Sequence, residues 1–188
     1  MFVEHWDDDT VDESMRVKHL ANYLIELAIQ KHEKLSLEKL HRILTDVHSF
    51  TLVSFSTRVF HESPTCMGDY PLYESIHDLL VWQQDHLSWR NKLFSPGLQP
   101  LCESLVAVPE GFKQEGVYLT PAKSFKALLE LLNTIYRFYM DNADKDTFIL
   151  TTGPNSAYAL ARSRSLLYIS EDILLGVGQR RAGLSQNT

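Results

Sequence analysis

Residues 35–55 repeat their apolar side chains at the three- and four-residue spacing of a helix more regularly than any other part of the sequence. The apolar positions on one side of such a helix are Leu37, Leu40, Ile43, Leu44 and Val47. Ser36 and Glu38 suit its first turn. The spacing therefore predicts an amphipathic helix, and the strand-prone residues from Thr51 to Phe60 leave open a short strand after it.

The same spacing recurs elsewhere in the chain. It predicts helices over residues 15–31, 72–94 and 120–141. A helix is also expected over residues 155–164, and a short closing helix is expected after Ser170, which can cap it. Residues 147–152 form only a short apolar piece before a Gly-Pro turn. Residues 101–119 contain many Val and Gly and predict a short β-hairpin or an extended connector. We therefore expect a mainly α fold, a single-domain helical bundle with one hairpin or connector.

The length of 188 residues is enough for one ordinary domain with a sizeable core. Residues 1–13 carry six acidic and no basic side chains and predict an acidic N-terminal arm. The helical domain is expected over residues 14–178, and residues 179–188 are expected to be a flexible C-terminal tail. The acidic start has the wrong sign for a signal or transit peptide, and the apolar runs are short, so we expect a cytoplasmic protein that does not enter a membrane.

The charge and the cysteines exclude several classes of protein. The net charge of −6 provides no general attraction to nucleic acid or to anionic lipid. Cys66 and Cys102 lie far apart with no Cys-x-x-Cys pairing, and two reduced thiols explain them. Because no four side chains have the spacing of zinc ligands, we expect neither a metal ion nor a cofactor.

Two other functions stay open on the residues alone. His41, Asp46 and His48 are the candidate set of a small metal-dependent or His/Asp hydrolase, although no Gly-x-Ser-x-Gly elbow accompanies them. Histidines that are exposed or line the core are the simpler interpretation. A DNA-binding autoregulator is the other function, and it would use the arginines near the end of the chain: Arg162, Arg164, Arg180 and Arg181.

Aromatic and charged side chains gather in two places, a composition typical of protein interfaces. The first group is Trp82, Asp85, His86, Trp89 and Arg90. A helix places positions 82, 85, 86 and 89 on one side, and burial of both tryptophans in the core is the alternative. The second group, in the acidic arm, is Trp6, Asp7, Asp8 and Asp9. It suits a basic partner protein, with a solvated tail as the alternative.

Four segments resemble, in order, the motifs of the Panacea domain, a family found in bacteria and phages. They are ANYLIELA at residues 21–28, KLHRILT at 39–45, PLYESIHDLLVW at 71–82 and LLELLNTIYRFY at 128–139. Trp82 matches the tryptophan of the family's Trp and Gly-Pro motif, whose Gly-Pro is absent here. The Thr-His near the family's last helix is Thr151-Thr152 in this chain.

This resemblance implies a mostly helical domain that works without catalysis as an antitoxin, or as a related adaptor or inhibitor, and a phage or mobile-element origin. Such a domain neutralises or recruits a partner protein, a toxin or a host or defence factor, by binding it directly. We therefore expect a protein-binding protein with no catalytic residues. We expect its contact surface to be the segment from Trp82 to Arg90, helped by the acidic arm.

Overall fold

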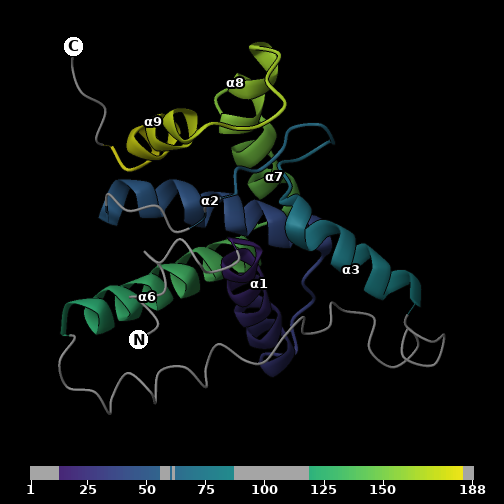
Figure 1. Ribbon diagram of the computed structural model, residues 1–188, viewed down its shortest axis with the longest axis vertical. Helices are drawn as coiled ribbons and strands as arrows, with labels where there is room; N and C mark the ends of the chain where they lie inside the picture. The colour runs from purple at the N-terminus through teal and green to yellow at the C-terminus, as the bar shows by residue number, and fades with distance from the viewer. Residues whose placement is uncertain (1–12, 56–59, 61, 87–118, 184–188) are drawn as a thin grey trace.

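The structure is a computed structural model that describes residues 13–55, 60, 62–86 and 119–183, and these residues form seven helices (Figure 1). The helices are α1 (Glu13–Gln30), α2 (Leu37–Phe55), α3 (Glu74–His86), α6 (Leu119–Asp141), α7 (Asp144–Thr152), α8 (Ala157–Ser163) and α9 (Glu171–Arg181). No sheet occurs in these ranges, where Thr65 forms isolated bridges with Leu72 and Tyr168. The predicted mainly α fold is confirmed, while the hairpin expected over residues 101–119 lies outside the described residues except for its last position.

Helix α2 lies at the centre of the bundle, and α1, α6, α7 and α9 pack around it (Figure 1). Every residue from Lys39 to Ser49 is buried, so all sides of this part of the helix are covered. The helix continues to Phe55, where the sequence had left a short strand open. Helix α2 therefore buries its polar side as well as its apolar side, and the polar side chains need partners inside the protein.

The buried apolar side chains form two clusters. The larger cluster joins α1, α2, α3 and α6, and the smaller one joins Cys66 to α8 and α9. Helix α9 lies directly on α2 because Gly178 has no side chain there. A Cβ atom at Gly178 would meet Val53 Cγ2 at 2.8 Å and the carbonyl oxygen of Ser49 at 2.9 Å.

Several element boundaries differ from the sequence prediction. Residues 144–152 form helix α7, whereas a short apolar piece was expected over residues 147–152. Asp144 and Asp146 lie in its first turn, where negative charges interact favourably with the positive end of the helix dipole. Helix α8 begins after Ser156, whose hydroxyl accepts a hydrogen bond from the Ala159 N–H at 3.1 Å. Helix α9 runs to Arg181, past the expected end of the helical domain and into the expected tail.

The apolar side of α2 provides the first test of this fold. Leu44 is fully buried in the larger cluster, so we expect Leu44→Ala to lower the free energy of unfolding by about 3 kcal/mol. Leu40→Ala should have a similar effect because Leu40 is equally buried. Urea denaturation would measure both, with the exposed Lys34→Ala as the control. Unchanged midpoints for both leucine variants would contradict this packing.

Candidate functional site

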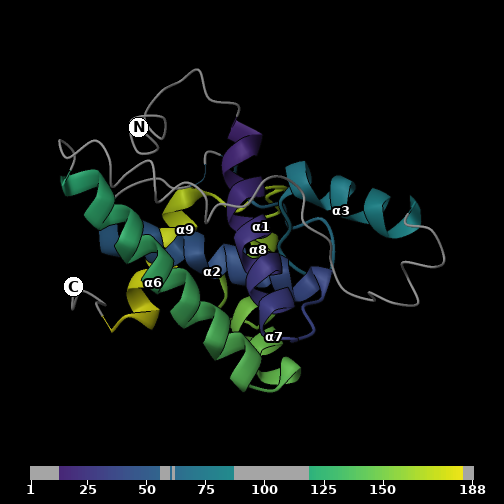
Figure 2. The same ribbon diagram turned by 90° about the horizontal axis from the view of Figure 1, so that it is seen from below.

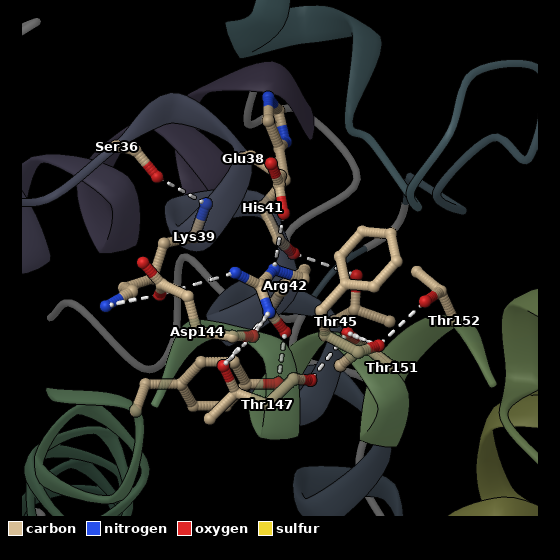
Figure 3. A network of polar contacts seen from close by, with 12 residues as sticks. Ser36, Glu38, Lys39, His41, Arg42, Thr45, Asp144, Thr147, Thr151 and Thr152 are labelled. Carbon is tan, nitrogen blue, oxygen red and sulfur yellow. Dashed lines mark hydrogen bonds and ion pairs between the residues drawn. The ribbon is translucent and has the colours of Figure 1, made fainter. Parts of the chain in front are cut away.

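A fully buried arginine joins α2 to α7 (Figure 3). The Arg42 side chain donates a hydrogen bond from Nη1 to Thr147 Oγ1 at 3.0 Å, and its Nε lies 3.3 Å from Glu38 Oε1. Its Nη2 lies 3.8 Å from Asp144 Oδ1, a carboxylate that Lys39 Nζ contacts at 2.7 Å. The first turns of α2 and α7 are therefore held together by charged and polar contacts.

The same guanidinium also lies against aromatic rings. Its central carbon is 5.8 Å from the centre of the Tyr139 ring and 5.5 Å from the centre of the Phe148 ring. Contacts of this kind between a cation and a ring face are favourable. Arg42 thus contacts Phe148, a residue of α7 whose side chain reaches the surface.

An ion pair between the buried Asp46 and the partly exposed Arg181 joins α2 to α9. Both terminal nitrogens of Arg181 contact the Asp46 carboxylate, and the Nη2–Oδ2 distance is 2.9 Å. Tyr139 from α6 donates its hydroxyl hydrogen to Asp46 Oδ2 at 2.8 Å. The Asp46 side chain is 5% exposed, so these two partners replace the water that the carboxylate loses.

The two histidines of α2 take part in the core. His41 Nδ1 accepts a hydrogen bond from the Tyr73 backbone N–H at 3.1 Å, and His48 Nδ1 lies 3.1 Å from the Tyr73 hydroxyl oxygen. Burial, together with the neighbouring His77 ring at 5.4 Å between ring centres, lowers the pKa of His41 to about 3. His41 is therefore neutral at physiological pH.

These contacts do not form the catalytic set of a hydrolase. His41, Asp46 and His48 are all buried and have core partners, and Asp46 is occupied by Arg181 and Tyr139. In the part of the chain that the structure describes, no three His, Cys, Asp or Glu side chains gather as metal ligands would. The geometry therefore favours a structural role for these three residues.

The arginines considered for DNA binding differ in their surroundings. Arg181 is taken up by Asp46, so its charge is balanced inside the protein. Arg162 lies over the Tyr158 ring, 5.5 Å from its centre, and donates to the Tyr158 hydroxyl oxygen at 2.7 Å. Arg164 and Arg180 are exposed. The set therefore does not act as four free cations.

Helix α7 carries its polar and apolar residues on unexpected sides. The residues of α7 that are buried are Thr147 and Thr151, one turn apart, and both hydroxyls are hydrogen-bonded. Phe148, Ile149 and Leu150 are 36%, 61% and 41% exposed. A surface helix of a protein that acts alone normally buries residues of this kind. Ile149 and Leu150 therefore form an apolar face of α7 that the described residues leave largely exposed, whereas Phe148 lies on another side of the helix.

The end of α6 meets α7 (Figure 2). An apolar groove lies there, beside this face. We call it the α7 groove. It is open to solvent and has a volume of about 240 Å³. Its lining residues are Phe138, Asn142, Asp146, Thr147, Ile149 and Leu150. A groove of this kind next to exposed apolar residues is typical of a site that receives an anchor side chain from another protein.

The surface expected from the sequence falls mostly outside the described residues. Trp82, Asp85 and His86 belong to the last turns of α3, whose backbone is described there but not those side chains. Trp89, Arg90, Trp6, Asp7, Asp8 and Asp9 lie outside the described ranges. The sequence analysis missed the α7 face, although three consecutive apolar residues between threonines and acidic residues were a signal for it.

No protein-family model matches this chain, and no match was found among curated proteins or among solved structures. Among the described helices, none has the length and apolar character needed to cross a membrane.

Proposed function

We propose that this chain is a non-catalytic protein that binds another protein directly, through the apolar face of α7 and the α7 groove. The observation that carries this proposal is the exposure of Ile149 and Leu150, beside the α7 groove, on a helix that buries threonines. Neighbouring apolar side chains on a surface favour association, because a partner that covers them removes them from water.

The more specific form of the proposal is an antitoxin-like protein, an adaptor or an inhibitor. The resemblance to the Panacea domain supports it, since members of that family act by direct binding to a partner protein. In this form the partner is a toxin or a host or defence factor, which the chain neutralises by covering part of its surface. The protein then works in the cytoplasm and needs neither a metal nor a cofactor.

The segment from Trp82 to Arg90 and the acidic arm remain proposed as additional contacts. Asp85 and Arg90, changed together to alanine, should leave the free energy of unfolding within about 1 kcal/mol if both are exposed. The same double variant should weaken partner binding tenfold or more. Equal binding would leave α7 as the main contact.

The decisive experiment compares two substitutions of nearly equal exposure. Ile149 on α7 is 61% exposed, and Leu167 in the connection between α8 and α9 is 60% exposed. We expect Ile149→Asp to keep the melting temperature and to weaken partner binding at least tenfold, because an aspartate in the contact would lose its water. Leu167→Asp should keep both properties.

Affinity capture from the native host with the wild type and both variants would measure this difference. A protein retained by the wild type and by Leu167→Asp, but lost with Ile149→Asp, would support the proposal. The same captured proteins with all three chains would contradict the role of α7.

A further inference from the structure

The connection between α8 and α9 pairs on one side with the connection between α2 and α3. An antiparallel bridge joins Thr65 to Tyr168. The hydrogen bonds on either side of it run from the Cys66 N–H to the Leu167 carbonyl oxygen, 2.9 Å, and from the Ile169 N–H to the Pro64 carbonyl oxygen, 2.8 Å. In an antiparallel pair with this pattern, the backbone groups of the two facing residues point away from each other.

The backbone of Tyr168 is left open at the outer edge of this pair. On the inner side, Thr65 exchanges two backbone hydrogen bonds with Leu72, at 2.7 and 3.1 Å. The N–H and C=O of Tyr168 point the other way, and neither has a hydrogen-bond partner in the part of the chain that the structure describes. Tyr168 is also exposed. The segment from Leu166 to Ser170, which we call the Tyr168 edge, is therefore open to a further strand.

Apolar side chains are exposed along the Tyr168 edge. Leu166, Leu167 and Tyr168 follow one another there, and the exposed Met67 comes directly after Cys66, which pairs with this edge. Proteins commonly protect a free edge with charged side chains or a proline, because it would otherwise pair with another strand. The sequence of the edge, LLYIS, contains no charge and no proline. Its composition therefore favours pairing.

The charges before and after the Tyr168 edge have opposite signs. Two basic residues precede it and two acidic residues follow it: Arg162, Arg164, Glu171 and Asp172. Arg164 and Asp172 are both exposed, and they lie at equal distances in sequence from Tyr168. When two antiparallel copies of the edge pair about Tyr168, the basic end of one copy meets the acidic end of the other. The charge pattern therefore matches a second copy of this chain at both ends of the pair.

We propose that the Tyr168 edge pairs with the same edge of a second copy of this chain and forms a twofold dimer. The Tyr168 N–H of each copy donates to the Tyr168 carbonyl oxygen of the other, and Arg164 of each copy lies beside Asp172 of the other. A twofold axis through Tyr168 makes every such contact twice. The four charges between Arg162 and Asp172 cancel, so the net charge of −6 on the whole chain does not fall on this contact.

This dimer goes beyond the proposed function and uses a different surface. None of the residues that line the α7 groove belongs to the Tyr168 edge. Two backbone hydrogen bonds, two ion pairs and a few apolar side chains make a small interface, so we expect a dissociation constant on the order of 100 μM. The chain is then monomeric at the low concentrations of affinity capture, and the comparison of Ile149→Asp with Leu167→Asp is not affected.

Exchange of the two charges tests the pairing. Sedimentation equilibrium of the full chain from about 10 μM to about 1 mM would measure association. We expect Arg164→Asp and Asp172→Arg each to weaken the dimer at least tenfold, because like charges then meet at both ends. An equimolar mixture of the two variants should associate as the wild type does, since each end of the mixed dimer again joins a basic to an acidic side chain. Ile149→Asp and Arg180→Asp, exposed positions outside the edge, are the controls and should dimerise normally.

A second measurement needs no variant. Amide signals of residues 166–170 in an NMR spectrum of the wild type should shift as its concentration rises, and the Tyr168 N–H should exchange more slowly with solvent. A chain that stays monomeric at about 1 mM would overturn the inference and leave the edge to an extended segment of another protein. A dimer that neither charge variant weakens would lie on another surface. Variants that each fail to associate and do not recover when mixed would contradict antiparallel pairing about Tyr168.

Discussion

Arg181→Ala is expected to lower the free energy of unfolding by about 3–5 kcal/mol, because it leaves Asp46 as a buried carboxylate without its countercharge. The Asp46 side chain is 5% exposed and would keep only the Tyr139 hydroxyl as a described partner. Urea denaturation at neutral pH would measure the loss. The size of the effect comes from desolvation of the remaining charge more than from the attraction that is lost.

The chain offers a matched control next to this residue. Arg180 is exposed, and Arg180→Ala removes the same side chain at the neighbouring position with an expected change within about 0.5 kcal/mol. The double variant Asp46→Leu with Arg181→Met removes both charges and keeps the volume, so it should recover most of the stability. An Arg181→Ala protein as stable as Arg180→Ala would show that α9 is not held by this ion pair.

The path of α2 followed from its sequence, but the surroundings of α2 did not. The regular spacing of residues such as Leu40 and Leu44 is a local property, and it predicted the helix. The burial of Arg42 and Asp46 depends on Thr147 and Arg181, which lie more than one hundred positions further along the chain. A single sequence does not show such pairs, so these polar residues had no visible reason to be buried.

The candidate site was missed for a related physical reason. Prediction of a helix from one sequence assumes that apolar residues face the core, and α7 does the opposite with Thr147 inside and Ile149 outside. The buried side of α7 is polar because it meets Arg42, whose guanidinium needs hydroxyl and carboxylate partners. The apolar residues of α7 are then left for the surface, where a partner can use them.

Acidification is expected to destabilise the protein through His41. Its pKa is about 3 in the folded chain and about 6.5 when unfolded, so the unfolded chain binds more protons between these values. The stability contributed by the neutral ring is complete above about pH 6.5 and is lost as the pH falls toward 3. The full loss is about 5 kcal/mol, of which about 2 kcal/mol falls between pH 6.5 and pH 5.

His41→Asn separates this residue from the other groups that titrate. The asparagine oxygen can accept the hydrogen bond from the Tyr73 N–H but does not gain a proton, so the variant should lose about 2 kcal/mol less than the wild type between pH 7.5 and pH 5. The comparison uses the slope against pH, since burial of the amide lowers the stability of the variant at every pH. His32→Asn is the control, because His32 is exposed at φ 56°, a conformation that asparagine tolerates. Parallel slopes for wild type and His41→Asn would mean that His41 does not stay neutral in the folded protein, and would place the acid sensitivity elsewhere in the chain.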